Sequence, residues 1–245
     1  MTARFFAAGI AAAALTLVSA CGDDVVPGTP TADSTSTTLT SVSATPTTTS
    51  PKAAAASTTV PPAAWIPSAK LPLADSENWP ELSTVAEPLG TNSFQVTELC
   101  SGTPFAVGDA DNARAVVDNG ADNWSAEQVI VHYPGDPWTM GQTAHAVFTT
   151  LQSTLTGCKS ASAQVSVTTA PNTHCPSVQR GPCNQVAAEI DLPDKHAHVY
   201  LAAVGSAITE LTVWSTGSPA TPWTATDDEG VFAAMNPQLC TVWEC

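Results

Sequence analysis

The N-terminus carries an apolar segment that decides in which compartment the rest of the chain must fold. A single positive charge, Arg4, precedes the uncharged stretch from Phe5 to Ala20, which ends in two small residues, Ser19 and Ala20. A basic start, an apolar centre and small residues before the cleavage point are typical of the signal peptide of an exported protein. We therefore assign residues 1–20 to a signal peptide and expect the remainder to fold outside the cytoplasm.

Cys21 directly follows Leu17-Val18-Ser19-Ala20, and this order resembles the lipobox of bacterial lipoproteins. The resemblance implies cleavage before Cys21 and a diacylglycerol on its sulfur. Several acyl chains hold a protein stably to a bilayer, whereas no later apolar run reaches the roughly 20 residues of a membrane span. We expect lipid anchoring at the extracytoplasmic face of the cell membrane. The alternative is a secreted protein in which Cys21 is incidental.

The cysteine count agrees with a lipidated Cys21. The chain has seven cysteines, so six remain when Cys21 carries lipid. An even number in an exported domain indicates disulfide bonds, because that compartment is oxidising. Spacing alone does not choose among the pairings of six cysteines. The disulfide candidates are Cys100, Cys158, Cys175, Cys183, Cys240 and Cys245.

The charge of the chain excludes one large class of partner. The net charge is −15, with only seven Lys and Arg residues. Binding to a phosphate backbone needs clustered cations, and those of the folded part are scattered, so we expect no nucleic-acid partner. An anionic lipid surface would likewise repel the domain. The folded part contains Lys70, Arg114, Lys159, Arg180 and Lys195.

Composition divides the mature chain into a linker and a domain. The stretch Thr29 to Pro62 consists almost entirely of Thr, Ser, Ala, Pro and Val. Such a segment has too little apolar bulk to offset the entropy of ordering. We therefore expect residues 21–63 to be a disordered tether, a plausible place for O-linked glycans, and residues 64–245 to form one extracytoplasmic domain.

Alternating and apolar stretches predict a mainly antiparallel sheet. Asn119-Gly120 between two such stretches indicates a hairpin, and Gly205-Ser206 indicates a second hairpin whose strands lie centrally in the sheet. We expect one helical turn near Glu81 to Val85. The expected strands are Phe94–Leu99, Ala113–Val117, Trp124–Tyr133, Gln164–Thr168, Val186–Ile190, Ala197–Val204 and Ala207–Trp214.

Two longer segments predict helices. From Trp138 to Cys158, apolar residues recur at steps of three and four, and we expect Thr139 to cap the start and Gly157 to end the helix. The second helix covers Val231 to Leu239, after a capping-box spacing from Thr226 to Glu229. The chain is therefore an α+β domain, with an antiparallel β-sheet flanked by two main helices and stabilised by disulfides.

This arrangement resembles the extracytoplasmic sensor domains of the mycobacterial PknH-type receptor kinases, which also occur in stand-alone actinobacterial lipoproteins. The residues that carry the resemblance are the strand Trp124 to Tyr133, the helix Thr143 to Leu155 with Gly157-Cys158, and the strand pair Val199–Val204 and Leu211–Trp214. The resemblance implies disulfides and a solvent-open cleft for an unidentified ligand. The kinase and the spanning helix of that family are absent from this sequence.

The sequence offers few constellations for catalysis or metal binding. Gly205-Ser206 and Gly217-Ser218 lack the second glycine of a Gly-x-Ser-x-Gly nucleophile turn. His196 and His198 would share one face of a strand, and with His174, Cys175 and Cys183 they form a conceivable zinc set. The oxidising compartment instead favours a Cys175–Cys183 disulfide, which leaves the two histidines at an exposed strand edge. We therefore expect no catalytic residue, metal or cofactor.

Two further groups of residues have both a structural and a functional interpretation. The acidic and amide residues between Asp109 and Asn123 suggest calcium, but their spacing departs from an EF-hand loop at Ala113, and such residues are common in turns. Seven tryptophans could stack on a ligand, or could hold irregular loops against the sheet, which we favour. The tryptophans considered are Trp65, Trp79, Trp124, Trp138, Trp214 and Trp223.

These observations predict a lipid-anchored protein that binds or senses a ligand in a cleft, without catalysis. The partners are then the membrane, through the lipid on Cys21, and an unknown small ligand. The alternative is an accessory module that docks onto an envelope protein, and a hydrolase is a weaker one. A pocket with a few convergent polar groups would favour ligand binding, whereas a flat apolar patch would favour docking.

Overall fold

The computed structural model describes one folded unit built on a six-stranded sheet. The described residues are 59–90, 94–100, 102–104, 106–119, 123–158, 164–168, 183–219, 221–223 and 228–245. The strand order is β1-β2-β6-β5-β4-β3, and each of these neighbouring pairs is antiparallel. The predicted signal peptide, Cys21 and nearly all of the predicted tether lie outside the described residues.

The strands agree closely with the sequence pattern, except at the first expected position. The hairpin β5–β6 occupies the centre of the sheet, as predicted, and Gly205 at its turn has a positive φ of +57°. A side chain at Gly205 would also meet the backbone of Cys245, so glycine fits this turn for two reasons. The strands are β1 (Asp111–Asn119), β2 (Trp124–His132), β3 (Gln164–Thr168), β4 (Cys183–Asp191), β5 (Lys195–Val204) and β6 (Ala207–Thr216).

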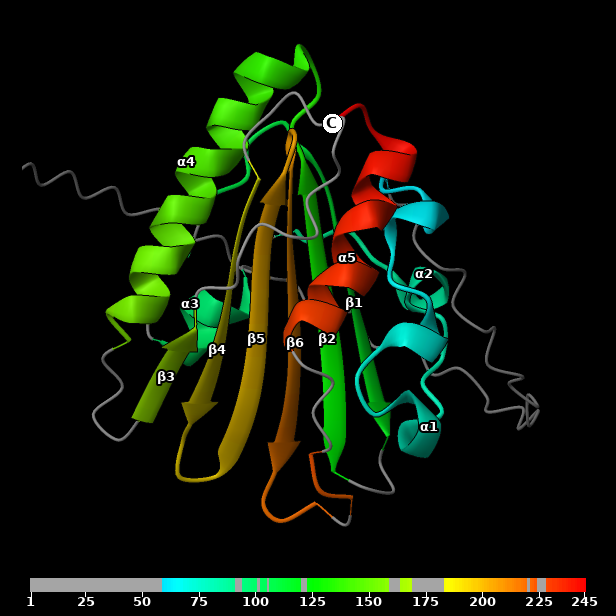
Figure 1. Ribbon diagram of the computed structural model, residues 1–245, viewed down its shortest axis with the longest axis vertical. Coiled ribbons are helices and arrows are strands. Elements are labelled where there is room, and N and C mark those ends of the chain that lie inside the picture. The colour runs from blue at the N-terminus through cyan, green and yellow to red at the C-terminus, as the bar shows by residue number, and fades with distance from the viewer. Residues whose placement is uncertain are drawn as a thin grey trace, which may run out of the picture. The chain divides into compact units, whose positions relative to one another are not determined.

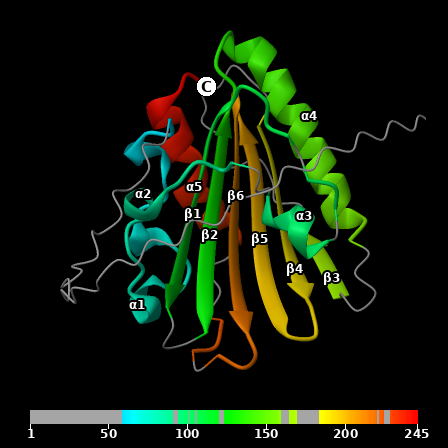
Figure 2. The same ribbon diagram turned by 180° about the vertical axis from the view of Figure 1, so that it is seen from behind.

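Helices cover both faces of the sheet (Figures 1 and 2). One face carries the long helix α4 (Pro137–Thr156) and the short helix α3 (Gln95–Leu99). The other face carries α5 (Asp228–Val242) and an irregular N-terminal region. That region contains the 3-10 turns η1 (Pro62–Ala64) and η2 (Ser68–Lys70) and the short helices α1 (Ala74–Glu77) and α2 (Leu82–Val85). The α+β class with an antiparallel sheet and two main helices is therefore confirmed.

Two apolar cores lie on the two faces of the sheet. Alternate residues of β5 enter different cores: Tyr200 and Ala202 pack under α5, whereas Val199 and Leu201 pack under α4. Because a strand directs successive side chains to opposite faces, a strand covered on both sides is apolar throughout. This explains the dense apolar composition of the central hairpin.

The strand predicted at Phe94–Leu99 is wrong, because residues Gln95–Leu99 form helix α3. Val96 and Leu99 are both buried in the core under α4, and a spacing of three fits one helix face. The short apolar pattern could fit either structure. A contact distant in sequence supports the helix, because the backbone N–H of Val96 donates to the Glu210 carboxylate at 3.3 Å.

The predicted C-terminal end of α4 is confirmed, whereas the predicted N-cap is wrong. Gly157 is the C-cap, as expected. The N-cap is Asp136 rather than Thr139: the Asp136 carboxylate accepts from the Thr139 backbone N–H and hydroxyl, both at 2.8 Å. Pro137 stands at the first helical position, which favours an earlier start. The capping-box residues Thr226 and Asp227 lie outside the described residues.

Two of the expected disulfides are present. Cys100–Cys158 joins the end of α3 to the residues after α4, and Cys240–Cys245 closes a short C-terminal loop. Cys175 lies outside the described residues, so its predicted pairing with Cys183 stays a prediction. The Asn119-Gly120 turn also lies partly outside them.

The folded part begins earlier in the chain than the composition suggests. Val60 is buried in the core under α5, and η1 starts at Pro62, although both residues fall within the predicted tether. Across the described ranges, no helix is long and apolar enough to cross a membrane.

Candidate ligand-binding groove

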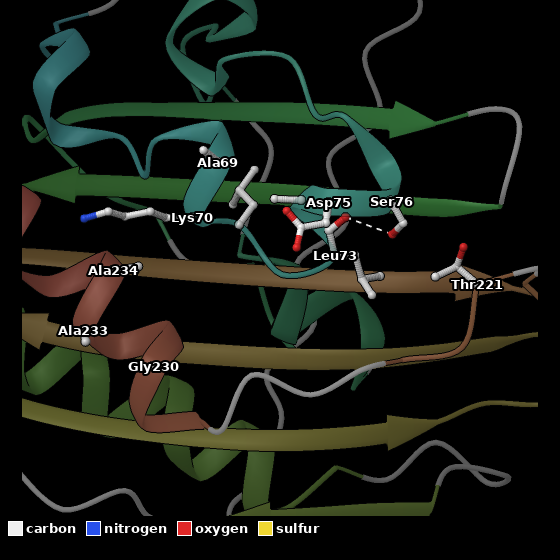
Figure 3. A pocket seen from close by; sticks show the side chains of 11 residues that line it. Ala69, Lys70, Leu73, Asp75, Ser76, Thr221, Gly230, Ala233 and Ala234 are labelled. Carbon is white, nitrogen blue, oxygen red and sulfur yellow. Dashed lines mark hydrogen bonds between the residues drawn. The ribbon is translucent and has the colours of Figure 1, made fainter.

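A groove of about 770 Å³ runs between the N-terminal region and α5 (Figure 3). This volume lies within the range of small-molecule sites. Figure 3 shows Lys70 toward one end, and Asp75, Ser76 and Thr221 toward the other. The lining residues are Ala69, Lys70, Leu71, Leu73, Ala74, Asp75, Ser76, Thr221, Gly230, Ala233 and Ala234.

Two buried hydrogen bonds hold the N-terminal wall of the groove, one to the sheet and one within the wall itself. Gln128 of β2 accepts from the Ile66 backbone N–H at 3.1 Å and donates to the Thr209 hydroxyl at 3.1 Å. The Trp79 indole donates to the Pro72 carbonyl at 2.8 Å, which closes the loop around α1. Ile66 and the buried Trp79 therefore hold this irregular segment before and after the residues that line the groove.

The opposite wall, α5, is held by its inward side chains. Phe232 packs edge-on against Tyr200 with ring centroids 5.7 Å apart. Asn236, which is fully buried, donates to Gln185 at 2.9 Å. The helix exposes only small residues to the groove, namely Gly230, Ala233 and Ala234 at steps of three and one. Larger side chains at these positions would occupy the groove.

The backbone at the floor of the groove adopts an uncommon conformation. Leu73 precedes α1 with φ of +61°, in the left-handed region, and its side chain is buried. Branched side chains rarely adopt this conformation, and strained backbone of this kind clusters at functional sites. In Figure 3 the carbonyl of Leu73 accepts from the Ser76 hydroxyl at 3.0 Å. The turn thereby places Leu73, Asp75 and Ser76 together on the groove.

The predicted exposed edge at His196 and His198 is wrong. Both belong to β5, a central strand, and the side chain of His198 is only 4% exposed, against 36% for His196. They do share one face, as expected, with their Nε2 atoms 3.0 Å apart. His198 also stacks on Trp223, with ring centroids 3.7 Å apart. Because Trp223 comes after β6, the sequence around His198 alone could not predict that this tryptophan covers the ring.

A small polar pocket of about 120 Å³ adjoins His198. Its lining includes Glu189, Tyr200, Asp228 and Ser166. Burial, aided by the nearby charge of His196, lowers the pKa of His198 to about 4, so this ring is neutral at physiological pH. Burial, with the Asp228 carboxylate contributing, raises the pKa of Tyr200 above its ordinary value. Neither residue therefore carries charge under ordinary conditions.

A second group of buried polar residues lies on the opposite face, beneath α3. Burial raises the pKa of Glu210 to about 8, with the nearby Glu127 carboxylate contributing. Burial also raises the pKa of Glu127, whose Oε2 accepts from Gln95 at 2.9 Å. The Thr212 hydroxyl donates to Glu210 at 3.1 Å. These two glutamates were not predicted as site residues, although both stand within the apolar stretches that predicted β2 and β6.

The tryptophans mostly hold loops against the sheet, as favoured. Trp65, Trp79 and Trp124 are buried. Trp223 packs on His198 and lies 5.6 Å from Trp124 between ring centroids. Trp138 on α4 is the exception, because its surface is 62% exposed. Among the described residues, the tryptophans do not form an exposed row that could stack on a ligand.

The described residues that the sequence suggested for calcium, zinc or a nucleophile do not come together in one site. Asp111 pairs with the ring of His132 at 3.2 Å, rather than with the other acidic residues considered for calcium. Among the described residues, no group of three or more His, Cys, Asp or Glu side chains is arranged to hold a metal ion. His174 and Cys175 lie outside the described residues. Gly205-Ser206 forms the β5–β6 turn, as expected.

The groove itself could be found only in part from the sequence. Its helix wall belongs to the predicted second helix, but the residues of η2 and α1 come from a proline-rich stretch without a regular pattern. Asp75 and Glu77 in the first turn of α1 are a local signal for a helical turn there. The distance between this turn and α5 depends on packing across the whole sheet.

One of the solved structures that resemble this chain is a mycobacterial protein. A crystal structure of an uncharacterized Mycobacterium smegmatis protein, the ortholog of Rv0999, matches 60% of this chain and 73% of its own, at 13% identity and a TM-score of 0.31. No model of a protein family matches the sequence, and no curated protein matches it.

Proposed function

We propose that this protein is a lipid-anchored ligand-binding or sensing protein on the extracytoplasmic face of the cell membrane. Its small ligand occupies the groove lined by residues 69–76, Thr221 and α5, hereafter the α1–α5 groove. The observation that carries the proposal is the groove itself, with two anchored walls and a lining of apolar and polar residues. Sites with this mixture bind small organic molecules. The predicted signal peptide and the resemblance of the residues before Cys21 to a lipobox support the proposed location.

The lining indicates the chemistry of the ligand. Leu71, Leu73 and the small residues of α5 offer an apolar surface, while Lys70 and Asp75 offer opposite charges. A compact molecule with an apolar body and polar groups at separate ends fits this arrangement. The resemblance to PknH-type sensor domains belongs to the same proposal and rests on the sequence pattern alone.

An accessory docking module has less support. Large apolar side chains exposed among the described residues are Val85, Val116 and Trp138, on α2, β1 and α4 respectively. Docking surfaces are usually contiguous apolar patches. A hydrolase is the weaker alternative, because among the described residues that line the groove no histidine stands beside Ser76 to act as a base.

Native mass spectrometry of the exported full-length protein tests the proposal. The protein should carry a discrete non-covalent adduct that is lost on denaturation. Ala233→Trp fills the groove from α5 and should remove the adduct, whereas Ala146→Trp, an exposed position of α4, should retain it. An adduct that survives Ala233→Trp in a folded protein would place the ligand elsewhere. A wild-type protein whose native mass shows no adduct would contradict ligand binding and favour the docking module.

A further inference from the structure

Two histidines of β5 bring one ring nitrogen each to the same point. Nε2 of His196 lies 3.0 Å from Nε2 of His198, and the two rings are nearly perpendicular, at 82°. We propose that this pair binds a divalent late transition-metal ion, of the class of Ni²⁺, Cu²⁺ and Zn²⁺, through its two Nε2 atoms. The site shares no residue with the lining of the α1–α5 groove.

The distance between the two nitrogens suits two ligands of one ion. Metal–imidazole bonds of about 2.0–2.1 Å in tetrahedral geometry separate two ligand nitrogens by roughly 3.3 Å. The observed separation of 3.0 Å differs from this value by a few tenths of an ångström. A small movement of His196, whose side chain is 36% exposed, would accommodate the ion. His198 can stay in place on the Trp223 ring.

Each histidine has a carboxylate behind its other ring nitrogen. The register of β4 against β5 places Asp191 opposite His196 and Glu189 opposite His198. Asp191 contacts Nδ1 of His196, and a Glu189 oxygen lies 3.6 Å from Nδ1 of His198. Carboxylates in this position orient metal-binding histidines and raise their basicity. The cross-strand pairs thus supply both the ligands and their support.

The two histidine rings can free both Nε2 atoms for a metal ion without releasing a proton from the pair. An ionised Asp191 can only accept, so its contact with Nδ1 of His196 requires a proton on that nitrogen. The Nε2 atom of a neutral His196 then accepts from Nε2–H of His198, and this hydrogen is the proton shared between the two rings. When the ion replaces that shared proton, the proton of His198 moves to Nδ1, which faces Glu189. Both Nε2 lone pairs are then available to the metal.

The surroundings favour a late transition metal over calcium or magnesium. Both proposed ligands are imidazoles, which suit copper, nickel and zinc, whereas calcium and magnesium prefer oxygen ligands. The described residues offer no third protein ligand, so water completes the coordination on the exposed side of His196. Cu²⁺ binds nitrogen sites most strongly among these ions, which makes it the most sensitive probe.

Electron paramagnetic resonance of the tag-free, oxidised full-length protein with one equivalent of Cu²⁺ tests this site. The wild-type spectrum should show coupling to two imidazole nitrogens. His196→Gln should leave one nitrogen and weaken Cu²⁺ binding more than tenfold. Asp191→Asn should keep two nitrogens and weaken binding by about 10- to 100-fold, the effect of losing a supporting carboxylate.

His145→Gln is the matched control, because His145 lies on α4 and bonds to Asn184, and no bond from it to a second histidine is present among the described residues. This variant should bind Cu²⁺ as the wild type does. A wild-type spectrum without two nitrogens, or His196→Gln with unchanged affinity, would overturn the site. If His196→Gln does not fold, unchanged affinity in Asp191→Asn, at a half-exposed carboxylate, would overturn it equally.

Discussion

The Val96 backbone N–H donates to a carboxyl oxygen of Glu210, 114 residues later in the chain. The bond fixes the first turn of α3 to β6, in the core between the sheet and α4. Glu210 is also close enough to Glu127 for the two carboxylates to influence each other's ionisation. The first turn of α3 is therefore hydrogen-bonded to two buried glutamates, Glu127 and Glu210.

Stability should decline as pH rises across the range in which Glu210 stays protonated only in the folded state. Its pKa is about 8 when folded, against about 4.3 for an unfolded chain. The folded state therefore binds more protons between these values, and its contribution to stability is lost as pH rises toward 8. Glu210→Gln removes this dependence, so the variant should gain stability relative to wild type with increasing pH.

The measurement is the thermal midpoint of both proteins at intervals from pH 5 to pH 9. Glu98→Gln, at an exposed position on the same helix α3, serves as the control and should keep the wild-type profile. A constant difference between Glu210→Gln and wild type at every pH would show that Glu210 is not protonated in the folded protein.

The Cys100–Cys158 disulfide should contribute more to stability than Cys240–Cys245. The first closes a loop over a sequence separation of 58 and the second over one of 5, and longer closed loops restrict the unfolded chain more. Replacing Cys100 and Cys158 together with alanine should cost about 2–5 kcal/mol. The matched double variant at Cys240 and Cys245 should cost less, as measured by urea unfolding. A larger loss in the C-terminal variant would contradict this order.

Asp136 should stabilise α4 in a pH-dependent way. Its hydrogen bonds from the Thr139 backbone and hydroxyl hold the pKa of the carboxyl below its ordinary value. This stabilisation is present above the unfolded pKa and is lost as pH falls through the folded one. Asp136→Ala should therefore lower the thermal midpoint at pH 7 and have little effect near pH 2. Thr139→Ala tests the original assignment, and a larger loss from it at pH 7 would restore Thr139 as the principal cap.

The sequence predicted those elements whose stabilisation is local or periodic. The helix from Pro137 to Thr156 and the hairpin around Gly205-Ser206 show clear periods and turn residues, and both are present. Helix α3 was missed because five residues are too few to show a period. Its structure depends on Glu210 and on the disulfide to Cys158, both distant in sequence.

Polar sites were harder to predict because burial depends on the whole fold. The pattern His196-Ala197-His198 correctly gave a shared face, but not the central position of β5 or the cover by Trp223. The partners Glu189 and Asp191 become visible only once the β4–β5 register is known. The groove was equally hard to predict, because its two walls are about 160 residues apart in sequence and each contacts the sheet separately.

If the protein is exported as predicted, the six cysteines other than Cys21 should all be oxidised. Two pairs are present, and the remaining pair, Cys175 and Cys183, is predicted to bond. Alkylation of denatured protein without reductant should then modify none of the six, and the intact mass should be lower by two hydrogens for each disulfide. Labelling at Cys175 and Cys183 alone would contradict their pairing and leave two free thiols near β4.

Cys21 should be the point of attachment to the membrane. If the lipobox is processed, the mature protein begins at a cysteine that bears several acyl chains, enough for stable anchoring. The wild-type protein should partition into detergent and release a lipid-modified N-terminal peptide on proteolysis. Cys21→Ser removes the acylated sulfur and should yield an unprocessed or secreted form that stays in the aqueous phase. Ser19→Ala preserves the small residue before the cleavage point and should behave as wild type, whereas unchanged detergent partitioning of Cys21→Ser would exclude this anchor.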